Sequence, residues 1–386
     1  MDREEKVISG RVFRANRNTQ AAKWNLEVLR RLRQKLELNP EMDILKLLTP
    51  AYSSHLEYWK QPGPTPIAQE YASLMLEPKS VLSCDDVRSE LAEATDLSVI
   101  SPLTPDILGL FPGLFISQGI KSLLSRARIV YQATSTVFSI DDKFAIKISP
   151  RNLSTEHKAL RFLRCHLEDF LAPRSHGLVQ LGGYYIMFST YIPGRTLQEA
   201  WPELNLGDRL NVSAQLGELV RELRTVEFCE HNPLGGVWGE GCRDARRDVR
   251  HTNVPIRTVA QFENWMYTAS QCSKPCVSFL HSLINQEEGA KVVLTHGALQ
   301  PENIIVQQAE NETWKIQGLV DWDASGYYPE YWEAFKATHE VHTIRGHEWS
   351  RYLPEIISPL RFPTRWMADR LLESGMEHSS SGASNS

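Results

Sequence analysis

The chain has 386 residues, of which 42% are hydrophobic, and this length suffices for one large core or for two lobes with an extension. Its formal net charge of −5 gives no basic excess, so we expect no nucleic-acid partner. No apolar run reaches the roughly 18 residues of a membrane span, and the first residues lack the apolar segment of a secretory signal. We therefore expect a cytoplasmic protein that binds no membrane.

The first 120 residues differ in texture from the rest of the chain. Residues 20–48 carry apolar side chains at helical spacing, with Arg and Lys on the other face, which predicts an amphipathic helix. The run QPGPTPI at residues 61–67 would interrupt any regular element. We predict that residues 1–120 form a partly helical N-terminal extension of unknown role, and a protein partner that binds through it is one hypothesis.

A small β-rich lobe is predicted over residues 121–193. Runs of β-branched and aromatic residues predict strands, and Asp141-Asp142 and Gly182-Gly183 are typical of tight hairpin turns. The helix between the two hairpins has Ser154 or Thr155 as a candidate N-cap. The predicted order is strand, strand, helix, strand, strand, over residues 127–140, 143–149, 154–167, 177–182 and 184–192.

After Pro193-Gly194 the pattern becomes mainly helical. Leu206 begins an apolar stripe that recurs at helical spacing as far as Leu223, and two strand-like pieces follow at residues 303–308 and 314–320. We predict a helical C-lobe over residues 194–372. A polar tail, residues 373–386, has the composition of a disordered segment.

Six cysteines are spread along the chain, which favours free thiols over a disulfide framework. Cys272, Cys276 and His281 offer three candidate zinc ligands, but their spacing matches no common zinc motif and a fourth ligand is not evident. We therefore expect no structural zinc.

The residues with the clearest chemistry lie at 296–303, which read HGALQPEN. A kinase catalytic loop reads H-R-D-L-x-x-x-N, in which the Asp takes the proton of the acceptor hydroxyl and the Asn holds a magnesium ion. His296 and Asn303 occupy the matching positions. Ala298 stands where the catalytic aspartate is expected.

Two further motifs fit the same chemistry. Asp321, at the end of the apolar run LVDWD, is placed to be the second magnesium ligand with Asn303, because Mg²⁺ takes oxygen ligands from one or two side chains, water and phosphates. Lys147 in the strand motif FAIK is the expected phosphate-binding lysine. Its carboxylate partner is best matched by Glu156, with Glu168 as a poorer candidate.

These motifs together resemble the aminoglycoside phosphotransferase family, in particular its fungal members, within the protein-kinase-like and choline-kinase-like group. The similar stretches are LTHGALQPENIIV, GLVDWDASGYYPEYWEAFKA, YYIMFSTYIPGRTLQEAW and PIRTVAQFENWM, between about residue 128 and about residue 336. The resemblance implies an α+β, two-lobed protein-kinase-like fold that binds ATP and Mg²⁺ and phosphorylates a hydroxyl of a small molecule. It also implies that adenine binds at the hinge formed by Thr190, Tyr191 and Ile192.

The chain departs from the family pattern in two ways. Residues 132–136 contain no glycine-rich turn over the phosphates, which is a mild departure. Ala298 is a serious one, because a methyl group cannot accept a proton. Three hypotheses remain open: a slow small-molecule kinase in which Asp323 or Glu302 replaces the base, a pseudokinase that acts as a scaffold or regulatory module, and a deliberate replacement of an aspartate. The acidic residues after Tyr331 show no clear signature of a cationic acceptor.

Overall fold

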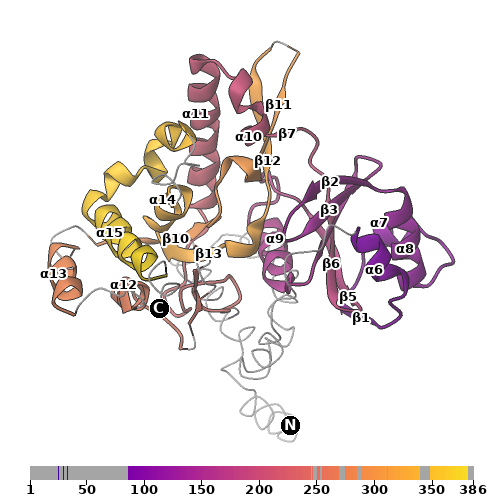
Figure 1. Cartoon of the computed structure of the whole chain (residues 1–386), viewed down its shortest axis with the longest axis horizontal. Coiled ribbons are helices and arrows are strands. Elements are labelled where there is room, and N and C mark those ends of the chain that lie inside the picture. Colours follow the sequence, from indigo (N-terminus) through magenta and orange to yellow (C-terminus); the bar gives the residue numbers. More distant parts are fainter. Residues whose placement is uncertain are drawn as a thin grey trace, which may run out of the picture. The chain divides into compact units, whose positions relative to one another are not determined.

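The computed structural model describes residues 86–380 apart from 245, 247–249, 253, 269–273, 285–288, 311 and 340–347, together with the helical residues Asn25, Leu29 and Arg33. All elements discussed below belong to the compact unit Pro78–Ser386 (Figure 1). The rest of the helix predicted over residues 20–48 lies outside the described residues, as does the run at 61–67.

The N-lobe is built on a six-stranded antiparallel sheet with the strand order β1-β5-β6-β4-β3-β2. The strands are β1 (Leu97–Ser101), β2 (Arg128–Gln132), β3 (Thr136–Ile140), β4 (Phe144–Ser149), β5 (Ser175–Leu181) and β6 (Tyr184–Thr190). The hairpin turns at Asp141-Asp142 and Gly182-Gly183 are confirmed, and both aspartates have a positive φ, which is typical of hairpin turns.

The strand predicted over residues 127–140 is wrong in one respect, because the structure divides it into β2 and β3. The chain turns at residues 133–135, where the Ala133 N–H donates to the Ser135 carbonyl over 2.9 Å. This turn contains neither Gly nor Pro, so the composition of the segment conceals it.

The N-lobe begins before residue 121, which corrects the predicted boundary. Strand β1 pairs with β5, and the helices α6 (Val87–Ala92), α7 (Pro105–Leu108) and α8 (Ile116–Arg126) lie against the sheet (Figure 1). Apolar residues of these helices share one core with the sheet: Val87, Leu91, Ile107, Ile120, Leu123 and Leu124. Residues 86–120 are therefore part of the lobe and not of a separate extension.

The two faces of the N-lobe sheet lie against different parts of the molecule. Along β4, Ile146 and Ile148 belong to the core that α6–α8 cover, and Lys147 between them must point to the opposite face, because side chains alternate along a strand. Helix α9 (Ser154–His166) lies beside that opposite face (Figure 1). The sheet thus presents its lysine towards the rest of the molecule.

Helix α9 occupies the predicted range, but its N-cap differs from the prediction. The N-cap residue is Leu153, and neither Ser154 nor Thr155 caps the helix. Instead the Asn152 side chain accepts a hydrogen bond of 2.8 Å from the Ser154 N–H. The first-turn N–H of Ser154, which has no partner within the helix, is thereby hydrogen-bonded by the residue before the N-cap.

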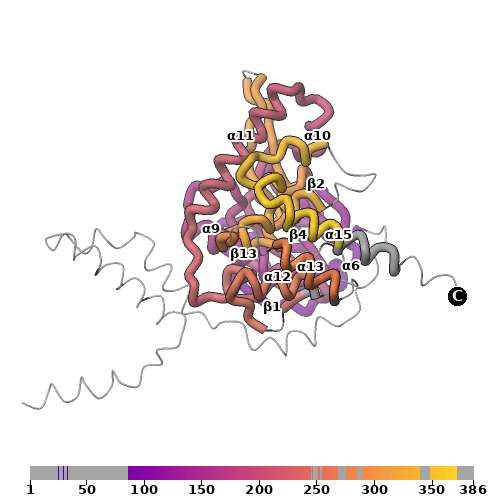
Figure 2. The backbone as a smooth tube through the Cα atoms, turned by 90° about the vertical axis from the view of Figure 1, so that its left-hand side faces the viewer, coloured from indigo at the N-terminus to yellow at the C-terminus, as the bar shows by residue number. Residues whose placement is uncertain are grey.

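The C-lobe is mainly helical, as predicted. Its α-helices are α10 (Leu197–Ala200), α11 (Leu206–Leu223), α12 (Val259–Thr268), α13 (Lys274–Ile284), α14 (Trp332–Ala337) and α15 (Pro363–Ser380). Its 3₁₀ turns are η1 (Trp201–Glu203), η2 (Pro301–Asn303), η3 (Trp322–Ala324), η4 (Glu348–Tyr352), η5 (Glu355–Ile357) and η6 (Pro359–Arg361). Figure 2 shows α12, α13 and α15 gathered on one side of this lobe.

Three small sheets carry the loops of the C-lobe. Their orders are β12-β11-β7, β10-β13 and β8-β9. The strands are β7 (Arg195–Thr196), β8 (Arg243–Asp244), β9 (Arg250–His251), β10 (Val292–Thr295), β11 (Ile304–Gln308), β12 (Trp314–Leu319) and β13 (Gly326–Pro329). The two strand-like pieces predicted at 303–308 and 314–320 are confirmed as the antiparallel pair β11 and β12.

The C-terminal tail is helical further than predicted. Helix α15 continues through Ser380, so the disordered tail predicted from residue 373 is wrong as far as residue 380. Residues 381–386 lie outside the described part of the chain. Within that part, no helix is long and apolar enough to cross a bilayer. A cytoplasmic location stays a prediction.

Free thiols are found at the four cysteines that the structure describes, Cys165, Cys229, Cys242 and Cys276. Cys84 and Cys272 lie outside the described residues, so the candidate zinc set with Cys272 has no described geometry.

Candidate active site

The structure brings Lys147, Glu156 and Asp321 into direct contact. The Lys147 Nζ lies 2.7 Å from Glu156 Oε2 in the first turn of α9 and 2.5 Å from Asp321 Oδ1 after β12. Glu168 lies elsewhere, because it is exposed and pairs with Arg164 at the end of α9. The pairing of Lys147 with Glu156 rather than Glu168 is therefore the one that the structure contains.

One lysine faces two carboxylates here, so the charges are not fully balanced. Burial opposes the charge of Lys147, but Glu156 and Asp321 raise its pKa above the ordinary value. Burial likewise works against the charge of Asp321, yet Lys147 holds the pKa of that carboxyl below its usual range. Glu156 is the most deeply buried of the three, and burial raises its pKa to about 7 in spite of Lys147. Lys147 and Asp321 form the charged pair, and Glu156 is the carboxylate whose negative charge Lys147 does not balance.

The backbone at Asp321 turns sharply so that its side chain faces Lys147. Asp321 has a φ of 66°, in the left-handed region that non-glycine residues seldom adopt. The next residue, Trp322, is fully buried, and its indole N–H donates to the Leu319 carbonyl over 2.8 Å. The buried indole anchors the chain on both sides of the strained residue, and α9 packs against the η3 turn that it begins.

His296 fixes the start of the catalytic loop and does not face solvent. Its Nε2–H donates to the Val320 carbonyl over 3.0 Å, and its Nδ1 accepts from the Ala298 N–H over 3.2 Å. Burial lowers the pKa of His296 to about 4, so the ring is neutral near pH 7. Both ring nitrogens are engaged, and His296 holds the loop against the segment that leads to Asp321.

Glu333 in α14 is a functional residue that we did not assign from the sequence. Its buried carboxylate accepts the backbone N–H of His296 at 2.7 Å and that of Gly297 at 3.0 Å. Gly297 has a φ of 76°, and a Cβ there would lie 2.3 Å from the Ala324 carbonyl oxygen. The only available signal was an acidic residue within the apolar helix YWEAFKA. Glu333 positions the catalytic loop and does not line an acceptor pocket.

Asn303 closes the loop. Its Nδ2 donates to the Ala298 carbonyl over 2.9 Å, and its own carbonyl accepts from the Val320 N–H over 2.9 Å. No hydrogen bond to Asn303 Oδ1 is found among the described residues, so this oxygen is available to a cation. In the same part of the chain no group of three or more His, Cys, Asp or Glu could hold a metal. Asn303 and Asp321 fit an ion such as Mg²⁺, which completes its shell with water and phosphate.

The comparison with known protein families shows which family the chain belongs to. The model of the phosphotransferase enzyme family matches residues 131–355. The chain belongs to this family. The family resemblance inferred from the motifs is thereby confirmed, the likeness to fungal members stays a prediction, and the match extends beyond residue 336. No curated protein matches the chain.

Solved structures of aminoglycoside phosphotransferases are similar to the chain. A thermostable mutant of APH(4)-Ia in ternary complex with ADP and hygromycin B is 14% identical, with 68% of this chain and 91% of that chain covered and a TM-score of 0.45. The streptomycin–ATP–APH(2")-IIa ternary complex is 12% identical, with 67% and 90% covered and a TM-score of 0.40.

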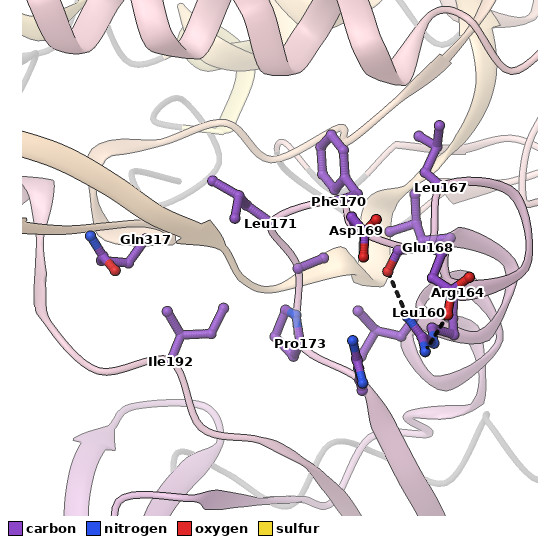
Figure 3. Close-up of a pocket in the computed structure, with 13 residues that line it drawn as sticks. Leu160, Arg164, Leu167, Glu168, Asp169, Phe170, Leu171, Pro173, Ile192 and Gln317 are labelled. Carbon is purple, nitrogen blue, oxygen red and sulfur yellow. Dashed lines mark hydrogen bonds and ion pairs between the residues drawn. The ribbon is translucent and has the colours of Figure 1, made fainter.

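The hinge residues of this phosphotransferase-family chain lie at the end of β6. The Thr190 N–H donates to the Arg174 carbonyl and the Tyr191 N–H to the Lys143 carbonyl. Among the described residues, the Ile192 N–H has no such partner and is available to a ligand. The Ile192 side chain instead lines a hollow of about 200 Å³ with Leu171 and other residues beyond the end of α9 (Figure 3). That hollow contains neither Lys147 nor Asp321, and of the predicted nucleotide-site residues it includes Ile192 alone.

The two candidates for a replacement base have different surroundings. Asp323 is bound by Arg243, whose Nη1 lies 2.5 Å from Asp323 Oδ2. Glu302 is exposed, although it is adjacent to Asn303 in the sequence. Asp323 Oδ1 is buried without a hydrogen-bond partner among the described residues, and Ala298 contributes only a methyl group to the loop.

Proposed function

We propose that this phosphotransferase-family protein binds ATP with Mg²⁺ through Lys147, Asn303 and Asp321, and that phosphate transfer to a small-molecule hydroxyl is lost or strongly reduced. The observation that carries the proposal is the contact of Lys147 with both Glu156 and Asp321. It joins the N-lobe strand, helix α9 and the segment after β12 at one point. An ammonium held in this way is positioned to meet phosphate oxygens.

The chain's own residues divide the work. Bound ATP with Mg²⁺ would supply a γ-phosphoryl group whose charge the ion partly neutralises. Lys147 orients the phosphates, Asn303 Oδ1 and Asp321 hold the cation, and the hinge at Thr190, Tyr191 and Ile192 receives the adenine. His296 and Glu333 keep the catalytic loop in place through the backbone.

The missing step is proton transfer from the acceptor. Removal of a general base typically lowers the rate by about 10²–10⁴. The Ala298 methyl cannot orient a hydroxyl, and both nitrogens of the buried His296 are already hydrogen-bonded. Binding of nucleotide requires none of these groups to accept a proton, so it is the function that the site retains best.

A non-catalytic scaffold is the second candidate, and Ala298 is the observation that favours it. Nucleotide would then stabilise a shape that another protein recognises, with residues 1–120 as the proposed contact. This candidate and a slow kinase share the nucleotide site and differ only in turnover.

Thermal unfolding tests the nucleotide site directly. We expect millimolar ATP with Mg²⁺ to raise the Tm by about 5 °C, because a ligand that binds only the folded state stabilises it by mass action. Lys147→Met should abolish the rise. Lys143→Met is the matched control, since it removes an exposed positive charge just before the same strand and should leave the rise intact. If the unmodified protein shows no rise at millimolar ATP, both candidates fail.

A further inference from the structure

A second group of charges lies in the C-lobe beside the catalytic loop. We call it the basic cluster and define it as Arg243 in β8, Arg246 after β8 and Lys336 in α14. Arg243 reaches Asp323, two residues beyond the metal-ligand candidate Asp321. The Lys336 carbonyl accepts a hydrogen bond of 2.8 Å from Gln300 Nε2 of the catalytic loop. The cluster therefore borders the loop that carries Ala298.

Two members of the basic cluster are matched by carboxylates. The buried Arg246 donates to both oxygens of Asp369, at 2.7 and 2.9 Å, and to both oxygens of Asp244, at 2.8 and 3.0 Å. Its guanidinium also lies 4.7 Å from the centre of the Trp332 ring. Arg243 pairs with Asp323. These contacts neutralise the arginines and fix them in place.

Lys336 is the unmatched member. Its residue surface is 8% exposed, yet its ammonium makes no hydrogen bond or ion pair with any residue that the structure describes. The centre of the Trp332 ring lies 6.0 Å from Nζ. Burial is the main cause that lowers the pKa of Lys336 to about 8, with Arg246 and Arg243 acting in the same direction and Asp244 and Glu333 against it. A buried, unpaired ammonium is unfavourable unless something else meets it.

The arginines near Lys336 are paired with carboxylates, and Lys336 itself is not. Among the described residues, Asp369 is shared between Arg246 and Arg370, Asp244 pairs with Arg246, and Asp323 pairs with Arg243. Glu333 is close in sequence to Lys336, but its carboxylate is occupied by the backbone of the catalytic loop. Asp323 is bound by Arg243 through Oδ2, and its Oδ1 is buried without a hydrogen-bond partner among the described residues. Lys336 is the cation of this cluster that no described carboxylate contacts.

We propose that Lys336, with Arg243, binds an anionic group of the second ligand of this site, a carboxylate or a phosphate ester, and that polycationic aminoglycosides are excluded. The inference rests on the proposed function, because it names the chemical class of the molecule that lies beside the nucleotide. An anion pairs the buried ammonium. A polycation brings like charge next to Lys336, and it is rejected.

Calorimetric titration with three probes tests this assignment. The probes are D-glycerate, glycerol 3-phosphate and hygromycin B, at one ionic strength set with NaCl so that general screening is the same. We expect either or both anions to bind, and the tighter of the two identifies the anionic group. Tighter binding of hygromycin B than of both anions would overturn the proposal, as would the absence of anion binding.

Variants at Lys336 supply the specific readout. Lys336→Met should weaken anion binding at least tenfold, and Lys336→Arg should restore most of it. Lys315→Met on the exposed side of β12 removes the same charge elsewhere and should have no effect. Should Lys336→Met fail to fold, Arg243→Gln provides a second variant with the same expected direction. Unchanged anion affinity in either folded variant would refute the assignment.

The titrations are run with and without ATP and Mg²⁺, which separates the two proposals. Anion binding without a nucleotide response leaves the inference intact and removes the proposed nucleotide function. A nucleotide response without anion binding removes the inference alone.

Discussion

The two sides of the catalytic loop differ in how completely their charged side chains are paired with side chains of opposite charge. On the nucleotide side, Lys147 contacts Glu156 and Asp321 within hydrogen-bonding distance. On the acceptor side, Ala298 offers a methyl group, and Lys336 is buried without a partner among the described residues. Both sides rest on the same support, because Glu333 holds the backbone between them. Under the proposed function, this difference corresponds to a protein that binds nucleotide and transfers phosphate poorly or not at all.

The largest effect is expected when a base is placed at position 298, because this would remove the main difference between the two sides of the loop. Ala298→Asp should raise ATP turnover by about 10²–10⁴, because the new carboxylate can orient and deprotonate a hydroxyl. A coupled assay of ADP release measures the change. Ala298→Asn is the matched control, since it has a similar shape but cannot act as a base. If the aspartate variant is no faster than the asparagine variant, the acceptor side lacks more than its base.

Removing the common support should weaken both sides together. Glu333→Ala leaves the buried N–H groups of His296 and Gly297 unpaired, and each costs about 1–3 kcal/mol of the free energy of unfolding. Denaturant titration measures this loss, and the Tm rise with ATP and Mg²⁺ should shrink as well. Glu355→Ala, at an exposed position, should change neither. A variant that loses stability but keeps its full nucleotide response would show that the loop does not need this support.

The smallest effect concerns the acceptor side alone and depends on pH. Lys336 has a pKa of about 8, set by burial and by its neighbours Asp244, Arg246, Arg243 and Glu333. Below pH 8 the ammonium is charged, so the affinity for sulfate should be constant, and above pH 8 it should fall by up to about tenfold per pH unit. Sulfate does not titrate in this range.

The control for this pH dependence is Lys336→Arg, which stays charged throughout. Its sulfate affinity should show no decline between pH 8 and pH 9. A decline of equal size in the arginine variant would assign the effect to another group.

Much of the nucleotide side could be predicted from the sequence, because its signals are local. Lys147 lies in a strand motif, Asp321 ends an apolar strand, and Glu156 follows in the next helix. The turn between β2 and β3 could not be predicted, since it contains no Gly or Pro. Strand β1 was missed because its partner β5 lies more than 70 residues further along the chain.

The acceptor side was less accessible for a physical reason. Glu333 acts on backbone groups 36 residues away, and a side chain that binds backbone leaves no pattern in the partner's sequence. The isolation of Lys336 depends on three elements that bring Arg243, Arg246 and their carboxylates together. Neither property is visible before the chain is folded.

The turn at Asp141-Asp142 has a consequence for how this protein could vary. Strand β4 alternates Ile146 and Ile148 towards the N-lobe core with Lys147 towards Asp321. A single residue added or deleted in that turn would reverse the alternation, sending the lysine into hydrocarbon and an isoleucine into the nucleotide site. The length of this three-residue connection, residues 141–143, therefore constrains this protein as tightly as the chemistry of the lysine itself, and changes in its length should be tolerated far less than changes in its composition.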